Sequence, residues 1–256
     1  MTILRVSKYN GKSRVKDPMD DSLVPIIPYE KLDDVATAFL QEYYPAALRI
    51  PMRGQDPVWV DPTELAKNMG LTVKNQRIRE DGSVFGQIYF DDTDTVMYDA
   101  NEDADVPTHI KGKTIVVDPQ IYLLRNLGSF NNTIVHECVH WAKHRKAFKL
   151  EQLFNTDASY ISCEVVGDAD SRISIKSTKY MEKQANQLAP RIQMPKEPFT
   201  IKAKEYIAYF MRQTDARHTV DVMEMVIGAL ERDYGVSRQA VKIRLVELGF
   251  EEAIGT

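Results

Sequence analysis

Hydrophobic residues recur every three or four positions in two early stretches of the chain, which is the spacing of helices that bury one face. The first stretch, 30–44, reads EKLDDVATAFLQEYY and is followed by a proline, which ends a helix. The second, 61–70, reads DPTELAKNMG, with Asp61 placed to cap the helix and Glu64 placed to complete a capping box. Residues 1–29 are polar and interrupted by prolines, and we expect a flexible arm there.

Residues typical of β-strands come next. The stretch 83–90 (SVFGQIYF) is rich in β-branched and aromatic residues, and 94–99 (DTVMYD) follows it after a short polar turn. We therefore expect these two strands to pair as a hairpin. The stretch 113–118 (KTIVVD) predicts a third strand, and 120–127 predicts a short helix.

Helical spacing returns in the second half of the chain. We expect a long helix over 131–148, a hairpin over 160–176, a helix over 178–189 that ends near Pro190, and a linker at 194–198 before two or three closing helices. This order of elements is typical of the α+β class, with a small antiparallel or mixed sheet, and not of alternating βαβ units.

Composition narrows the class of protein. The chain has 256 residues, 43% of them hydrophobic, which is enough to build a core. A net charge of −4 argues against a broad nucleic-acid footprint. Its two cysteines provide no disulfide framework, and no apolar run is long enough for a signal peptide or a membrane span. We expect a cytoplasmic protein with no membrane partner.

The expected long helix carries the motif with the clearest chemistry. Residues 136–140 read HECVH, so His136 and His140 stand four residues apart on one helical face. Two imidazoles at this spacing can bind one Zn²⁺, and Glu137 beside them can take a proton from water at the metal. The alternative is an amphipathic helix whose histidines lie on the surface.

Two neighbouring residues are poor ligands on geometric grounds. His144 lies eight residues from His136, about 12 Å along a helix axis, whereas the ligands of one zinc lie within about 4 Å of each other. We expect His144 to be solvated or to contact a ligand from outside the metal site. Cys138 points away from the two histidines and should pack in the core.

A third ligand must come from another part of the chain. In the stretch 180–195, four residues share one helical face: Glu182, Ala185, Asn186 and Ala189. The two alanines predict close packing against a second helix, where a carboxylate is unfavourable unless a cation meets it. This makes Glu182 the candidate, although it could also lie wet at the edge of that face.

Three other acidic residues are alternative candidates for the third ligand. Glu164 is a rival to Glu182, but it falls in an expected strand. Asp168 and Asp170 are more simply explained as turn residues.

The pairing of HECVH with EKQANQLAPRIQMP resembles the ImmA/IrrE metallopeptidase family, over about residues 30–200. The matching residues are His136, Glu137, His140, Glu182, Ala185, Asn186, Ala189, Met194 and Pro195. Pro190 and Gln193 depart from the family pattern, which puts the end of the third-ligand helix in question.

The resemblance implies a zincin-like domain over 30–198 that holds one Zn²⁺ per chain. The metal ligands would be His136, His140 and Glu182, and Glu137 would be the general base. It also implies proteolysis of a protein substrate, and some relatives cleave a helix-turn-helix repressor.

The C-terminal segment, 199–256, suggests a second function. Within it, LERDYGVSRQAVKIRLVELGF (230–250) predicts two helices around a glycine turn, the outline of a DNA-reading helix-turn-helix. Arg238, Lys242 and Arg244 could contact phosphates, which would make the chain a DNA-binding regulator with a structural or degenerate metal site. The acidic net charge favours instead a helical hairpin packed on the peptidase domain. An inactive interaction module that keeps the peptidase fold is a third possibility.

Overall fold

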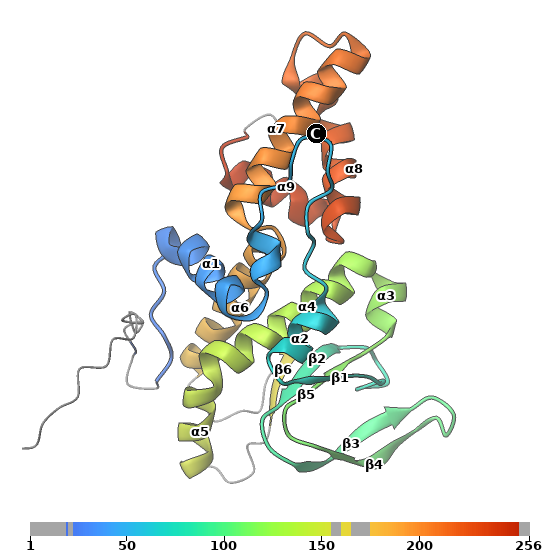
Figure 1. The fold of residues 1–256 in the computed structure, drawn as a ribbon. Helices are drawn as coiled ribbons and strands as arrows, with labels where there is room; N and C mark the ends of the chain where they lie inside the picture. Colours follow the sequence, from blue (N-terminus) through green and yellow to red (C-terminus); the bar gives the residue numbers. More distant parts are fainter. Residues whose placement is uncertain (1–18, 20–22, 155–159, 165–174, 251–256) are drawn as a thin grey trace, which may run out of the picture.

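The computed structural model describes residues 19, 23–154, 160–164 and 175–250 (Figure 1). Within these residues the chain is mixed α and β, with a small sheet and a group of C-terminal helices, as expected. Most of the expected arm and residues 165–174 of the expected 160–176 hairpin lie outside the described residues, and the expected end of that hairpin, 175–176, is helical instead.

The helices are α1 (Leu32–Tyr43), α2 (Pro62–Asn68), α3 (Gln120–Leu124), α4 (Leu127–Val139), α5 (Arg145–Phe154), α6 (Ile175–Gln193), α7 (Lys196–Thr214), α8 (Met223–Tyr234) and α9 (Arg238–Glu247). A π-helical turn, η3 (His140–His144), joins α4 to α5. The strands are β1 (Thr72–Asn75), β2 (Val84–Tyr89), β3 (Thr93–Asp99), β4 (Ala104–Ile110), β5 (Thr114–Val117) and β6 (Tyr160–Glu164).

The sheet is mixed and has the strand order β1-β5-β2-β6. Strands β1 and β5 run parallel, and β2 runs antiparallel to both β5 and β6. Five of the six residues of β2 are buried, which suits a central strand with a neighbour on each side. The predicted strands at 83–90 and 113–118 are therefore confirmed.

The predicted pairing of 83–90 with 94–99 is wrong. Strand β3 instead forms a separate two-stranded sheet with β4, in a register that places Thr93 opposite Ile110 (Figure 1). Half-exposed positions in β3 suit a hairpin that is wet on one face. Strand β4 contains Pro107, which is tolerated because a two-stranded sheet has only edge strands.

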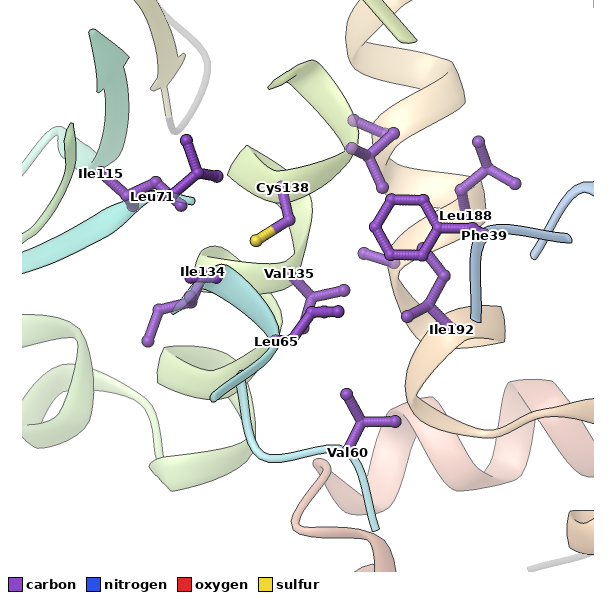
Figure 2. Packing of buried hydrophobic residues seen from close by; sticks show 14 of the residues in the cluster. Phe39, Val60, Leu65, Leu71, Ile115, Ile134, Val135, Cys138, Leu188 and Ile192 are labelled. Carbon is purple, nitrogen blue, oxygen red and sulfur yellow. The ribbon is translucent and has the colours of Figure 1, made fainter. Parts of the chain in front are cut away.

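Helix α4 forms the centre of the core and packs against β2 and β5 on one side and α6 on the other. Figure 2 shows Ile134 and Cys138 of α4 with Ile115 of the sheet to one side and Leu188 of α6 to the other. All four side chains are at most 1% exposed. The prediction that Cys138 packs in the core is confirmed.

Three expected boundaries need correction. Helix α6 continues through Pro190 to Gln193, because buried residues on both sides of the proline hold it in place. The expected linker at 194–198 is a tight turn, since α7 already begins at Lys196. The last residues of the expected arm are packed: Val24 is fully buried against Ala147 and Met181.

Helix α2 is capped by one residue and not by a capping box. The Asp61 carboxylate accepts hydrogen bonds from the backbone N–H groups of Thr63 (2.9 Å) and Glu64 (3.1 Å). The Glu64 carboxylate accepts instead from the Tyr44 hydroxyl, at 2.8 Å. The cap was therefore predicted correctly and the role of Glu64 was not.

The closing helices contact the helix that carries the motif. Helices α8 and α9 are joined at Gly235, which has a left-handed φ of 58°. The Asn131 side chain of α4 donates to the Gly235 carbonyl at 2.7 Å. A side-chain carbon at Gly128 would lie 2.2 Å from the Ser237 nitrogen, so glycine permits this contact.

Basic residues of α9 contact protein groups. Arg244 is 1% exposed, donates to the Met194 carbonyl at 3.1 Å and forms an ion pair with Asp33 of α1. Arg238 and Lys242 both pair with Glu224 of α8. These contacts favour the packed helical hairpin over a helix that presents its charges to phosphates.

Replacing Gly128 with alanine is expected to lower the free energy of unfolding by about 1–3 kcal/mol, because the new methyl group overlaps the backbone at Val236 and Ser237. Gly228→Ala in α8 is the matched control. The new methyl carbon at position 228 would lie 3.5 Å from its nearest neighbour. The substitution should therefore raise the free energy of unfolding by about 0.5–1 kcal/mol, because alanine has a higher helix propensity than glycine. Urea denaturation measures the free energy of unfolding of both variants. Equal changes in the two variants would contradict the close contact between Gly128 and the backbone at Val236 and Ser237.

Among the described residues, no helix combines the length and the apolar character needed to cross a bilayer.

Candidate metal centre

The two histidines of the motif meet inside the protein. His136 lies in the last turn of α4 and His140 begins the π turn, so both rings project from the same side of the helix. Their Nε2 atoms are 2.9 Å apart, and the residues are 1% and 0% exposed. The alternative of surface histidines is therefore wrong.

Glu182 of α6 completes the group. Its Oε2 lies 3.1 Å from His136 Nε2, and its Oε1 lies 3.1 Å from His140 Nε2. Ala185 and Ala189, on the same face of α6, are fully buried, as close packing requires. The Glu182 side chain is 25% exposed but faces both rings, so it does not lie wet at the edge of the face.

The donor set fits a divalent metal ion. Around a tetrahedral zinc with bonds of about 2.0–2.2 Å, ligand atoms are about 3.3 Å apart, close to the separations observed here. Two ring nitrogens and a carboxylate are electron-rich, and they repel one another at this range unless a cation or protons lie between them. His136, His140 and Glu182 therefore form a group that could hold a metal ion.

The protonation states of Glu182 and His136 also favour metal binding. Burial raises the pKa of Glu182, but the neighbouring His140 and His136 rings lower it by more, so the carboxylate stays ionised. Burial lowers the pKa of His136, which favours its neutral form with a lone pair to offer. The Asn186 side chain also hydrogen-bonds the His136 ring, one helical turn along α6 from Glu182.

Glu137 is buried beside this group without joining it. It is 0% exposed, and neither of its carboxylate oxygens has a hydrogen-bond partner among the described residues. Burial, followed by the negative charge of Glu182, raises the pKa of Glu137 well above its usual value. A carboxylate in this setting is a stronger base than one in water.

Gly86 in β2 makes room for Glu137 and was not among the predicted site residues. A side-chain carbon at Gly86 would lie 2.5 Å from Thr133 Cγ2 and 3.1 Å from Glu137 Oε1. A glycine inside an otherwise β-branched and aromatic strand is the signal that could have found it, because such a glycine often marks a close approach.

Gly86→Ala is expected to lower the free energy of unfolding by about 1–3 kcal/mol, because the added methyl group overlaps Thr133. Adding Thr133→Ser should recover most of the loss, since serine lacks Cγ2 and keeps the hydroxyl that donates to the Ser129 carbonyl. Urea denaturation of the single and double variants, with Thr133→Ser alone as control, measures this. A double variant no more stable than Gly86→Ala would locate the strain elsewhere.

His144 is not solvated, which corrects one of the two expectations for it. It is 0% exposed, its Nδ1 lies 2.9 Å from His140 Nδ1, and its Nε2 lies 2.8 Å from Gln184 Oε1. It does not belong to the three-residue metal group, so the geometric argument against a third imidazole ligand agrees with the structure. Gln184 was not predicted.

The remaining acidic candidates lie elsewhere or are not described. Glu164 ends β6, where it pairs in register with Val84. Asp168 and Asp170 lie outside the described residues.

Comparison of the sequence with known protein families finds no matching family, and comparison with curated proteins finds no matching relative.

Proposed function

We propose that this protein is a zinc-dependent metallopeptidase of the ImmA/IrrE type with a zincin-like fold. One observation carries the proposal: two imidazole nitrogens and a carboxylate converge from two helices, and an unpartnered buried carboxylate stands beside the first histidine. A site that only stabilised the fold would have no use for Glu137, whose buried and unpaired oxygens are unfavourable for folding.

In this proposal His136, His140 and Glu182 hold the ion, because two nitrogen donors and one carboxylate suit zinc. The ion supplies Lewis acidity, which makes water nucleophilic near neutral pH. Glu137 accepts a proton as the water oxygen attacks the scissile carbonyl carbon, and it then donates that proton to the amine nitrogen as the C–N bond breaks. The raised pKa of Glu137 makes it a stronger base for the first of these transfers.

The substrate in this proposal is a protein. The resemblance to the ImmA/IrrE family suggests a helix-turn-helix transcriptional repressor as the first candidate to test.

Removing the metal should abolish cleavage, and restoring it should recover cleavage. A chelator first removes metal from the protein. One half of the sample is then reloaded with Zn²⁺, and the other half is left without metal. Each half is incubated with a mixture of proteins derived from a proteome. Labelling of newly formed N-termini, followed by mass spectrometry, counts cleavage events. New termini are expected only in the reloaded sample, and equal cleavage by the stripped protein would contradict a metal-dependent reaction.

A further inference from the structure

A line of buried polar groups runs from His140 to the N-terminal segment. His140 Nδ1 meets His144 Nδ1 at 2.9 Å, and His144 Nε2 meets Gln184 Oε1 at 2.8 Å. The Gln184 amide nitrogen donates to the Pro25 carbonyl. His140, His144 and Gln184 are at most 1% exposed, so these contacts lie out of reach of bulk water.

The last group in the line sets the direction of every hydrogen bond. A backbone carbonyl only accepts, so Gln184 must turn its NH₂ group to Pro25 and its oxygen to His144. That oxygen only accepts, so His144 must carry its proton on Nε2. In a neutral ring, His144 Nδ1 is then an acceptor, and His140 must donate to it from Nδ1.

This direction leaves the other nitrogen of His140 available. With the ring proton on Nδ1, the Nε2 atom presents its lone pair to the space shared with His136 Nε2 and Glu182 Oε1. This is the arrangement that a metal requires of an imidazole ligand, because coordination uses the lone pair.

The π turn brings the second ring into place. Residues His140–His144 form a π turn between two α-helices, and such turns occur frequently at functional sites. The ring centroids of His140 and His144 are 4.9 Å apart, with the planes tilted by 58°. The turn thus places an acceptor beside the ring edge of His140 that faces away from Glu182.

We propose that His144 and Gln184 are positioning residues, which hold His140 as the tautomer whose Nε2 lone pair faces the metal. The hydrogen-bonded chain from His140 through His144 and Gln184 to the Pro25 carbonyl is called the relay below. The Pro25 carbonyl fixes the direction of its hydrogen bonds. The relay rests on the metal centre of the proposed function. It also assigns a role to the segment around Pro25, which packs through Val24 against Ala147 and Met181 and whose Ile27 N–H donates to the Tyr180 hydroxyl at 3.4 Å.

The ring tautomers of the wild-type protein test the relay directly. In a long-range ¹H–¹⁵N correlation spectrum of histidine-labelled protein, metal-free and zinc-loaded, His144 is expected to be protonated at Nε2 alone. His140 is expected to carry a proton on Nδ1 in both samples. A zinc-loaded protein with the His144 proton on Nδ1 would overturn the relay.

Metal affinity tests what the relay does. His144→Leu fills the space without an acceptor, and its affinity for Zn²⁺, measured by competition with a chromophoric chelator, should fall about 10–100-fold. His144→Asn places an oxygen near the position of Nδ1 and should recover most of that loss. His109→Leu, at an exposed histidine on β4 that contacts Asp94, is the matched control and should bind as wild type does.

The outcomes separate the relay from the metal centre. If wild type binds no Zn²⁺, the proposed function fails, while the metal-free spectrum still tests the relay. If wild type binds Zn²⁺ and His144→Leu binds it equally well, or if His144→Asn is as weak as His144→Leu, the relay is wrong. Should His144→Leu fail to fold by circular dichroism, Gln184→Leu replaces it with an expected loss of about 10-fold, and wild-type affinity there overturns the proposal.

Discussion

Glu137→Gln is expected to slow peptide hydrolysis by about 10²–10⁴-fold while the protein still binds one metal ion. Glutamine has the shape of glutamate but cannot accept the proton of the attacking water. Because Glu137 lies outside the ligand group, metal content should not change. The variant should also fold at least as well as wild type, since the substitution removes the need to bury a carboxylate without a partner.

The experiment compares new N-termini and metal content for wild type, Glu137→Gln and Glu102→Gln. Glu102 is exposed in the turn between β3 and β4, so its substitution removes one carboxylate far along the chain from the site and should leave both readouts unchanged. A Glu137→Gln protein that cleaves at the wild-type rate would rule out Glu137 as the base, even if the metal is present.

Glu182→Ala is expected to weaken Zn²⁺ binding by more than about 100-fold, because the loss of a ligand exceeds the 10–100-fold effect typical of groups that only orient ligands. Two histidine nitrogens remain, and the negative charge that compensates the ion is gone. Competition with a chromophoric chelator measures the affinity, and far-UV circular dichroism checks that the overall helical content is unchanged.

Glu197→Ala is the matched control for this substitution. Glu197 is exposed in the first turn of α7, the helix that follows α6, and its removal should leave the affinity unchanged. Equal affinities of Glu182→Ala and wild type would mean that the metal, if bound, lies elsewhere in the chain.

The candidate site was predictable because each half of it is local in sequence. His136 and His140 share a helical face by spacing alone, and Glu182 shares a face with Ala185 and Ala189, which predicted a close helix contact. The structure brings those two faces together. Helix α2 was predictable for a similar reason, since Asp61 caps it from the adjacent residue.

Strand pairing was not predictable in the same way. Strands β2 and β3 are adjacent in sequence, yet β2 pairs with β5 and with β6, which comes about 70 residues later. A central strand such as β2 needs a neighbouring strand on each side. Which strands take these places is decided by how the whole core packs, and not by their order in the sequence. Strand β4 escaped prediction because Pro107 lowers the strand character of its segment.

The relay and the close approach of α4 to Gly86 in β2 both depend on contacts between residues far apart in the sequence. Gln184 of α6 contacts His144 of the π turn, and Gly86 matters only because Thr133 and Glu137 of α4 pack against it. The π turn at His140 changes the direction in which His144 points, which an ideal α-helix drawn from the sequence does not reproduce. Apart from the glycine inside an otherwise β-branched and aromatic strand, the sequence pattern contains no signal for these relations.

Anomalous diffraction from crystals of the zinc-loaded protein, recorded on both sides of the zinc absorption edge, tests the metal centre most directly. We expect one anomalous peak per chain, within bonding distance of His136 Nε2, His140 Nε2 and a Glu182 oxygen. A protein without a peak at these three residues, after loading with Zn²⁺, would contradict the metal centre and with it the peptidase proposal.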